Sequence, residues 1–423
     1  MIEDIYKKFL ECDGIVSTDT RNILPNSLFF ALKGANFNGN LFAIEALKKD
    51  AKYCIIDENI EENEALILVD DVLLTLQKLA NYHRNKLGVN IIGIGGSNGK
   101  TTTKELLYSV FSTQFNCFCT QGNFNNHIGV PLTLLQLKPD HQVAIVELGA
   151  NKIGDIKELC EIAEPNSGII TNIGKEHLEG FGNIEGVAQA ESELFDFLIK
   201  TRGFCFVNID DFWLNNMSKR IGEKREYSIH DNNLILKKQV PAIVFDWNET
   251  IVNSHLPGIH NFQNIVAVIA IASHYGVSES NIKKGIEAYQ PQNNRSQFIK
   301  TEKNFIYLDA YNANPSSVMA ALITFKELNN QTQLAIIGDM FELGKFEDEE
   351  HQAIASFCES DCNFEVILVG NAFAKTRIIN SNIKIFAKKE DAIQYCISSK
   401  FENYNVLLKG SRGMKIEDFK TVF

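Results

Sequence analysis

The stretch NIIGIGGSNGKTTTKELL, residues 90–107, decides the fold of the central part of the chain. An apolar run leads into a glycine-rich loop, and a helical pattern follows, which is the order of elements in a phosphate-binding loop. The common form of that loop, G-x-x-x-x-G-K-[ST], needs a glycine at position 94, where this chain has isoleucine. Its glycines stand at positions 93, 95 and 96 instead. The stretch therefore predicts a nucleotide-phosphate site built on a loop of less common spacing.

The loop and the start of the following helix carry the groups that hold a phosphate. Glycine lets the backbone approach the phosphate oxygens, and the first turn of the helix directs its N–H groups toward them. Lys100 is expected on the β- and γ-phosphates, and Thr101 or Thr102 is expected to offer a hydroxyl to Mg²⁺. The residues predicted to bind the nucleotide here are Gly96, Ser97, Asn98, Gly99, Lys100, Thr101 and Thr102.

A carboxylate is predicted beside this loop. Glu147 lies near the end of the next apolar run, QVAIVELG at residues 142–149. Because the carboxyl ends of parallel strands meet at one edge of a sheet, Glu147 is expected where a nucleotide-bound Mg²⁺ needs a ligand. The chain has no N-K-x-D segment of the kind that reads guanine, which argues against a GTPase.

Composition and charge exclude several classes of protein. A chain of 423 residues is too long for one ordinary core, so two to three domains are expected. The net charge of −12 and the lack of a Lys/Arg-rich run argue against a nucleic-acid partner. No signal-like N-terminus and no apolar run of about 18 residues is present, so no membrane insertion is expected. The nine scattered cysteines predict buried, reduced thiols, and we expect a cytoplasmic monomer.

The alternation of apolar runs and helical patterns predicts an α/β protein with three domains. Short β-like runs and one helix, at 73–88, fill the domain predicted for residues 1–83. Buried strands alternate with helices in the domain predicted for residues 84–296, which indicates a mostly parallel sheet covered on both faces. Shorter runs at 225–256 predict an antiparallel extension. The alternation restarts near residue 304, so a doubly wound domain is predicted for residues 297–423.

Several motifs together resemble one family. Gly93, Gly96, Ser97, Gly99, Lys100 and Thr101 match the loop G-x-x-G-[TS]-x-G-K-[TS] of the Mur ligases. Segments along the rest of the chain resemble that family in the same order: STDTR at 17–21, LFFALKG at 28–34, GNFNNHIGVPLTLL at 122–135, HLEGFG at 177–182, LPGIHNFQNIVAVIAI at 256–271, DAYNANPSS at 309–317, GDMFELG at 338–344 and KGSR at 409–412. The resemblance implies a UDP-sugar domain, a P-loop ATPase-like domain and a Rossmann-like domain.

The resemblance also implies a reaction. Mur ligases use ATP to convert a carboxylate into an acyl phosphate, which an amine then attacks. DAYNANP is most similar to the branch that joins D-alanyl-D-alanine to UDP-MurNAc-tripeptide in cytoplasmic peptidoglycan precursor synthesis. ATP and two Mg²⁺ ions are the implied cofactors, and those two compounds are the implied substrates.

Residue roles follow from the same resemblance. It implies catalytic roles for Lys100, Glu147, His177, Glu191 and Arg295, and metal ligation by Thr101, Glu147, His177 and Glu191. It places Asn261 and Asn264 on adenine, Arg295 on the phosphates, and Asp309 beside the ribose with Tyr311 next to it. The implied substrate residues are Ser17, Thr18, Lys33, Gly34, Asn125, Asn126, Asn312, Asn314, Lys409, Ser411 and Arg412.

One residue departs from the family pattern. Many Mur ligases carry a lysine at the position of Glu191, two residues before Glu193, and its carbamylated tip turns toward the second metal. Glu191 keeps the negative charge but has a shorter reach. We hypothesise that it supplies its carboxylate directly or through a metal-bound water, which makes added CO₂ unnecessary. The alternatives are a weakened metal site or another residue in this role.

Three other functions stay open on the sequence alone. One is a different Mur-type ligase, and a second is a folylpolyglutamate synthase, although STDTR and LFFALKG argue against the folate enzyme. The third is a non-catalytic ATP-binding protein, which only the change at Glu191 suggests.

Overall fold

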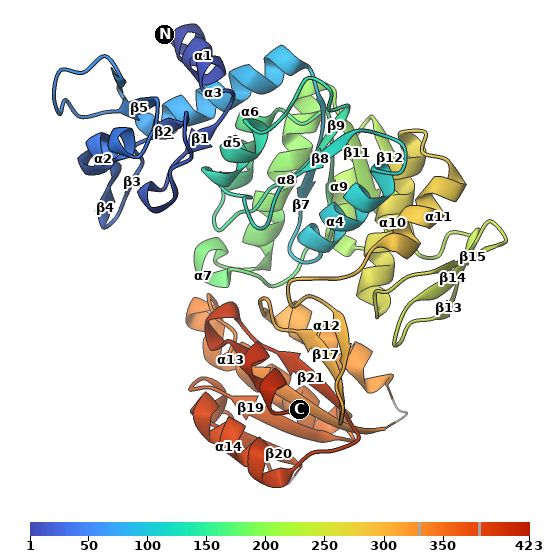
Figure 1. Cartoon of the computed structure of the whole chain (residues 1–423). Helices are drawn as coiled ribbons and strands as arrows, with labels where there is room; N and C mark the ends of the chain where they lie inside the picture. The colour runs from blue at the N-terminus through green and yellow to red at the C-terminus, as the bar shows by residue number, and fades with distance from the viewer. Residues whose placement is uncertain (329–330, 380–381) are drawn as a thin grey trace.

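The computed structural model describes residues 1–328, 331–379 and 382–423, and it forms three α/β units, each built on its own parallel or mostly parallel sheet (Figure 1). The predicted fold class is therefore confirmed. The predicted boundaries at residues 84 and 297 remain our proposal for the domains. Residue 84 lies in the last turn of a helix, and residue 297 is the first residue of a strand.

The N-terminal unit is a four-stranded parallel sheet in the order β1-β2-β5-β6, with a short hairpin beside it. Helix α3 packs against α1 of this unit and against α5 and α6 of the central unit, so it joins the two. It begins after Asp71, whose side chain accepts from the Leu74 N–H, and ends at Gly88 in the left-handed conformation. The elements are α1 (Ile2–Glu11), β1 (Val16–Ser17), β2 (Leu28–Phe30), β3 (Lys33–Gly34), β4 (Phe37–Asn38), α2 (Ala43–Lys48), β5 (Tyr53–Ile56), β6 (Leu66–Leu68) and α3 (Val72–Leu87).

The central unit contains a six-stranded parallel sheet in the order β12-β11-β10-β7-β9-β8. Strand β7 is buried on both faces: Ile91 belongs to one hydrophobic cluster, and Ile92 and Ile94 belong to another. Because β7 lies between β10 and β9, the loop that follows it opens at the middle of the sheet edge. The strands are β7 (Asn90–Gly95), β8 (Cys117–Cys119), β9 (Val143–Glu147), β10 (Ser167–Ile170), β11 (Phe204–Asn208) and β12 (Lys224–Tyr227).

Helices cover both faces of this sheet. They are α4 (Lys100–Phe111), α5 (Gly129–Leu134), α6 (Asp155–Ala163), α7 (Leu178–Phe181), α8 (Ile184–Thr201), α9 (Phe212–Ser218), α10 (Ile259–His274) and α11 (Glu279–Ala288). The predicted antiparallel extension exists as the sheet β13 (Leu234–Lys238), β14 (Val244–Trp247) and β15 (Thr250–Asn253). The prediction was wrong for residues 225–227, because β12, which begins at Lys224, pairs in parallel with β11 at the edge of the main sheet.

The C-terminal unit is a six-stranded sheet in the order β16-β17-β21-β18-β19-β20, in which β16 alone runs antiparallel to its neighbour. Successive residues of β18 enter different clusters, with Ile336 in one and Ile337 in the other, so helices cover both faces. The elements are β16 (Gln297–Lys300), β17 (Phe305–Asp309), α12 (Pro315–Lys326), β18 (Thr332–Gly338), α13 (Glu347–Asp361), β19 (Glu365–Val369), β20 (Ile383–Phe386), α14 (Lys389–Ser399) and β21 (Tyr404–Lys409).

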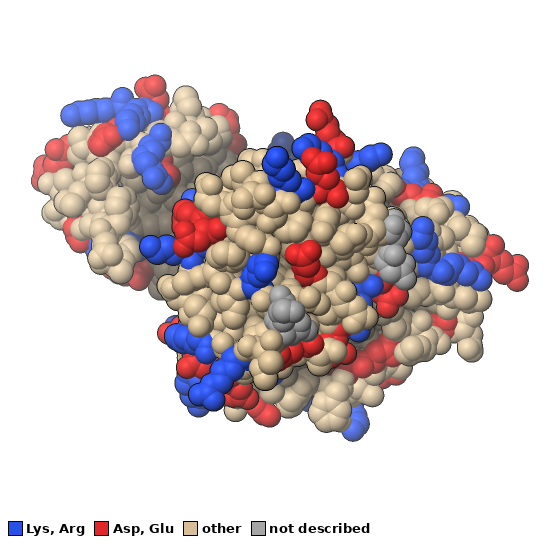
Figure 2. All heavy atoms as spheres, turned by 90° about the horizontal axis from the view of Figure 1, so that it is seen from below, with Lys and Arg blue, Asp and Glu red and all other residues tan. Residues whose placement is uncertain are grey.

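The composition predicts no basic surface patch, buried cysteines and no membrane-spanning helix. On the face shown in Figure 2, basic side chains alternate with acidic ones among the described residues rather than gathering in one area. All nine cysteines are free and buried, as predicted. Among the helices in the described parts of the chain, none has both the length and the apolar character that crossing a bilayer needs.

Candidate functional site

Two glycines fix the shape of the phosphate loop between β7 and α4. Gly96 has φ +113°, and a Cβ there would lie 2.2 Å from Thr171 Oγ1. Gly99 has φ +84°, and a Cβ there would lie 2.6 Å from Asn264 Oδ1. Side chains at either position would therefore strain the backbone and collide with neighbouring elements. The loop backbone is also held from β10, since Asn172 O accepts from the Ser97 N–H at 2.9 Å.

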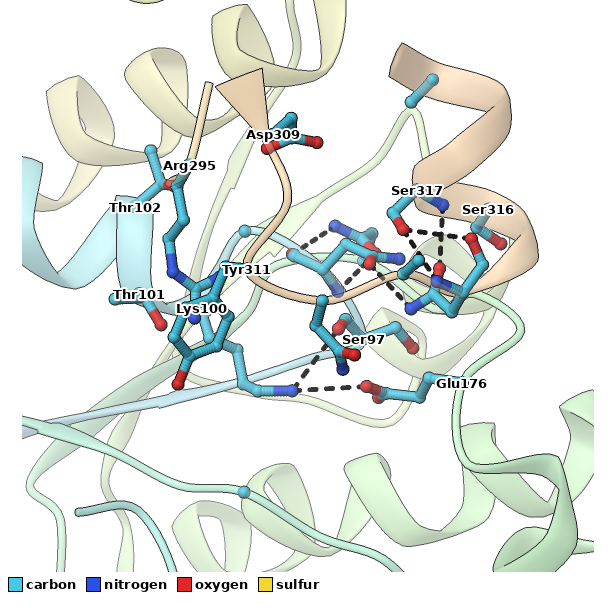
Figure 3. A pocket seen from close by; sticks show the side chains of 18 of the residues that line it. Ser97, Lys100, Thr101, Thr102, Glu176, Arg295, Asp309, Tyr311, Ser316 and Ser317 are labelled. Atoms are coloured by element: carbon cyan, nitrogen blue, oxygen red, sulfur yellow. Dashed lines mark hydrogen bonds and ion pairs between the residues drawn. The ribbon is translucent and has the colours of Figure 1, made fainter. Parts of the chain in front are cut away.

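Lys100, the first residue of α4, folds back onto the loop (Figure 3). Its ammonium donates to the Gly96 carbonyl and lies 3.5 Å from Glu176 Oε2. Burial would by itself lower the pKa of Lys100, yet the neighbouring carboxylates raise it. Burial raises the pKa of Glu176 to about 8 in spite of the lysine. One ammonium therefore stands at the head of the helix, where an anion is stabilised by both the charge and the helix dipole.

Glu147 lies next to Thr101, as the strand order predicts. Its Oε1 accepts from Thr101 Oγ1 at 3.2 Å and from Asn125 Nδ2 at 2.9 Å. Its Oε2 lies 3.4 Å from the ammonium of Lys104, a lysine that is only 1% exposed. Lys104 stands one helical turn after Lys100, so α4 presents one half-buried and one buried ammonium on the same side.

Glu191 lies beneath the loop rather than on the cavity wall. It is fully buried, and its Oε2 accepts from the Gly96 N–H at 2.6 Å. Burial raises its pKa, and Lys100 opposes that effect. Glu191 therefore supports the loop backbone, and its hypothesised contact with a metal remains a prediction.

His177 stands at the start of α7 with φ +42°. Its Nδ1 lies 2.5 Å from Glu342 Oε2, which comes from the C-terminal unit. Burial lowers the pKa of His177, although Glu342 raises it. The neutral imidazole that burial favours is the form that binds a metal.

A cavity of about 550 Å³ runs between the central and C-terminal units. Most of the predicted residues line it: Ser97, Asn98, Gly99, Lys100, Thr101, Thr102, Asn125, Asn126, Glu147, His177, Asn261, Asn264, Arg295, Asp309, Tyr311, Asn312, Asn314, Lys409 and Arg412. Gly96, Glu191 and Ser411 do not. Ser411 is 1% exposed, and its hydroxyl accepts from the Phe341 N–H at 3.0 Å.

Aromatic and charged side chains form the wall on the C-terminal side. The guanidinium of Arg295 stacks 3.6 Å from the centroid of the Tyr311 ring, and Arg412 lies 5.2 Å from the same ring (Figure 3). Lys409 donates to Asp309 Oδ2 at 2.7 Å. Although burial opposes it, Lys409 holds the pKa of Asp309 below its usual value. The residues expected at the ribose and at the dipeptide therefore lie in contact with each other.

Asparagines occupy the rest of the wall. Asn264 Nδ2 donates to Asn261 Oδ1 at 3.2 Å across one turn of α10, so both face the cavity from one side of the helix. Asn314 caps α12 and also donates to Asn98 Oδ1 at 2.9 Å. This bond joins the C-terminal unit directly to the phosphate loop.

The N-terminal residues Ser17, Thr18, Lys33 and Gly34 do not line this cavity. Lys33 lies in the hairpin β3–β4, and its ammonium lies 2.8 Å from both Asp57 and Glu58. The contact of Ser17, Thr18, Lys33 and Gly34 with a UDP-sugar remains a prediction.

Sequence reasoning missed three charged residues of the site: Lys104, Glu176 and Glu342. Lys104 carries a detectable signal, because it stands four positions after Lys100 in a helix. Glu342 lies inside the quoted GDMFELG segment. Glu176 directly precedes HLEGFG and had no signal of its own.

The residues present fit one divalent cation at Thr101 and Glu147. A hydroxyl and a carboxylate meet there, and Glu147 Oε2 is buried without a hydrogen-bond partner. In the described ranges no three His, Cys, Asp or Glu side chains converge on one point, so a second ion needs ligands from the nucleotide or water as well.

A strand–loop–helix phosphate site that faces a doubly wound unit across one cavity defines this chain as a multidomain nucleotide-binding α/β protein. Residues 94–272 match the model of the Mur ligase middle domain, and residues 294–412 match that of the Mur ligase, glutamate ligase domain. Together with the relatives described next, these matches show that the chain belongs to the Mur ligase family.

Curated relatives and solved structures agree with the assignment of the chain to the Mur ligase family. The UDP-N-acetylmuramoyl-tripeptide–D-alanyl-D-alanine ligase of Bacillus subtilis is 32% identical over 419 residues, covering 95% of this chain and 91% of the relative. MurF from Acinetobacter baumannii has a TM-score of 0.88 at 29% identity, covering 96% of this chain and 92% of that chain. MurF from Thermotoga maritima, solved in complex with ADP, has a TM-score of 0.84 at 24% identity, covering 97% and 96%, which shows the shared fold.

Proposed function

We propose that the chain is the ATP-dependent ligase that joins D-alanyl-D-alanine to UDP-MurNAc-tripeptide. The observation that carries this proposal is the cavity between the central and C-terminal units, which has the phosphate loop at one end and paired arginines on the facing wall. The relatives that span nearly the whole chain bear this activity in their names. The reaction belongs to cytoplasmic peptidoglycan precursor synthesis, and we expect the enzyme to act as a monomer.

The reaction proceeds in two steps. A carboxylate oxygen of the tripeptide attacks the γ-phosphorus of ATP, the bond to the bridging oxygen breaks, and ADP leaves. The amine of D-alanyl-D-alanine then attacks the acyl carbon, loses a proton, and inorganic phosphate leaves with the former carboxylate oxygen. The first step needs positioning and neutralisation of charge more than covalent help from the protein.

Lys100 supplies that neutralisation at the head of α4, where it leaves Glu176 for the γ-phosphate. Arg295 approaches the phosphates from the interdomain segment, held flat by Tyr311. Asn261 and Asn264 face the adenine, and Asp309 faces the ribose. Asn125, Asn126, Asn312 and Asn314 contact the reacting ends of the substrates. Lys409 and Arg412 attract the carboxylate of the dipeptide, with Ser411 behind them.

Thr101 and Glu147 would hold one Mg²⁺, and His177 would hold a second. When bound, these ions draw off negative charge from the phosphates and orient the acceptor carboxylate. At the far end of the substrate, Ser17, Thr18, Lys33 and Gly34 contact the UDP-sugar.

Mass spectrometry tests this proposal. The protein is incubated with ATP, D-alanyl-D-alanine and UDP-MurNAc-tripeptide. We expect a product with the summed mass of the two substrates less one water, with ADP and phosphate formed in equal amounts. Phosphate release that needs neither substrate would refute the proposal. Nucleotide binding without turnover would also refute it and would favour a binding protein.

A further inference from the structure

Phe341 lines the cavity, and the mechanism above gives it no task. Among the described residues that line the cavity, it carries the only hydrocarbon side chain larger than a methyl group. Phe341 is 46% exposed, whereas the nearby Met340 and Leu343 are buried. An apolar group of a substrate would gain free energy by covering this ring, because apolar surface on both sides would leave water.

Phe341 is held beside Arg412. Its backbone N–H donates to Ser411 Oγ at 3.0 Å. A Cβ built on Gly413 would lie 2.7 Å from Phe341 Cε2, so the ring lies directly against the backbone of the residue that follows Arg412. Because Phe341 and Arg412 both line the cavity, an apolar surface and a cationic residue adjoin in this part of the wall.

The residue after Phe341 faces the phosphate end of the cavity. Glu342 lines the cavity, and its Oε2 lies 2.5 Å from His177 Nδ1. Glu176, which directly precedes His177, lies 3.5 Å from the ammonium of Lys100. Phe341 therefore has a cationic residue beside it on one side and the phosphate end of the cavity on the other.

D-alanyl-D-alanine carries its chemical groups in the same order. Its amine must reach the acyl phosphate at the phosphate end of the cavity. Its carboxylate stands at the opposite end of the molecule, where the guanidinium of Arg412 attracts it. The methyl group of the second residue is bonded to the carbon that carries this carboxylate. A carboxylate on Arg412 therefore brings that methyl group next to Phe341.

We propose that Phe341 determines the selectivity of the enzyme for the second residue of the dipeptide. The proposal rests on the proposed function, which supplies the dipeptide and the direction of its amine. The methyl group of a second D-alanine covers part of the phenyl ring, whereas a second glycine leaves the ring in water. One methyl group in an apolar site changes kcat/KM by about 10- to 200-fold, and the partial exposure of the ring favours the lower end of that range.

Steady-state kinetics with a set of dipeptides tests the proposal. The full-length enzyme is given D-alanyl-D-alanine, D-alanyl-glycine, which lacks the second methyl group, or glycyl-D-alanine, which lacks the first. We expect wild type to prefer D-alanyl-D-alanine to D-alanyl-glycine by about tenfold in kcat/KM. In Phe341→Ala this preference should fall to about threefold or less, while the preference over glycyl-D-alanine stays as in wild type. Phe341→Leu, which keeps an apolar side chain, should retain most of the preference.

A matched control and two further constants separate selectivity from damage to the fold. Phe212→Ala removes a phenylalanine that is 72% exposed and does not line the cavity, so it should keep the wild-type preferences. In Phe341→Ala, the KM values for ATP and for UDP-MurNAc-tripeptide should equal those of wild type.

Three results would overturn the proposal: a wild type that uses D-alanyl-glycine as well as D-alanyl-D-alanine, an undiminished preference in Phe341→Ala, or a raised KM for UDP-MurNAc-tripeptide in that variant. The last result would place Phe341 against the tripeptide instead. If wild type forms the ligation product while any of these results holds, the proposed function stands and only the role of Phe341 fails.

Discussion

The phosphate end of the cavity and the N-terminal hairpin differ in how far the protein has prepared them for a ligand. At the phosphate end, side chains from α4, β9, α8 and the segment after β10 surround two glycines, and hydrogen bonds hold several of them in place. In the hairpin, Lys33 is 42% exposed at its side chain and pairs with the half-buried Asp57 and the exposed Glu58. The phosphate end is therefore built largely into the central unit, whereas the predicted recognition of the distant part of the substrate would depend on more exposed groups.

Removal of the loop lysine should have the largest effect. Lys100→Ala takes away the charge that neutralises the γ-phosphate, so we expect ligation to fall by roughly 10³-fold or more. The measurement is the rate of ADP formation that depends on both substrates. Lys152→Ala, at an exposed position in the same unit, is the matched control and should keep full activity. A Lys100→Ala enzyme within tenfold of wild type would erase the contrast between the two regions.

The second-largest effect is expected for Arg295, whose guanidinium stacks on Tyr311. Arg295→Ala should lower kcat by roughly 10²-fold, because a charge directed at the phosphates is lost. Arg295→Lys should keep only part of the kcat that Arg295→Ala loses, since an ammonium cannot stack flat on Tyr311 as the guanidinium does. Steady-state kinetics with ATP varied gives both values. Equal activity of the lysine variant and wild type would show that the stacking does not matter.

A half-buried histidine on the cavity wall predicts a pH dependence of stability. Burial lowers the pKa of His260 to about 4, against about 6.5 in an unfolded chain. The folded state therefore holds His260 neutral, and the stability this provides is complete above about pH 6.5 and is lost as the pH falls toward 4. We expect a loss of about 2 kcal/mol over that window, allowing for water in the cavity.

Urea unfolding of wild type and His260→Gln at several pH values checks this. The variant should show a smaller loss of stability between pH 6.5 and 4 than wild type. The exposed His230→Gln is the control and should follow wild type. If the free energy of unfolding depends on pH in the same way for wild type and His260→Gln, the cavity wall around His260 is as open to water as the N-terminal hairpin.

The hairpin lysine should give the smallest effect. Lys33→Ala should raise the KM for the UDP-linked substrate by about tenfold and leave the KM for ATP unchanged, because one charge contact to a distant part of the substrate is worth about 1.4 kcal/mol. Lys52→Ala, an exposed lysine in the same unit, is the control. An unchanged KM for the UDP-linked substrate in Lys33→Ala would mean that Lys33 forms only ion pairs within the protein and no contact with that substrate.

The sequence could predict features that a local pattern imposes, but it could not predict features that depend on contacts between distant parts of the chain. The strand at 90–95, the loop and the helix from Lys100 were predictable because burial and glycine conformation impose a local pattern. Glu147 was predictable because parallel strands end at one edge. Glu176 was not, because its importance comes from contact with Lys100, far away in the chain. Among the strands, the two-residue β4, the three-residue β8 and the antiparallel edge strand β16 were missed, because none of them shows a periodic pattern of its own.

If the loop makes the tripeptide carboxylate reactive by directing the γ-phosphoryl group of ATP onto it, an oxygen of that carboxylate must leave with the phosphate. UDP-MurNAc-tripeptide labelled with ¹⁸O in the reacting carboxylate is converted with unlabelled ATP and D-alanyl-D-alanine, and the released phosphate is analysed by mass spectrometry. The account predicts one ¹⁸O atom in each phosphate, because the carboxylate oxygen leaves with phosphorus. Phosphate free of ¹⁸O, formed together with the ligated product, would contradict the account.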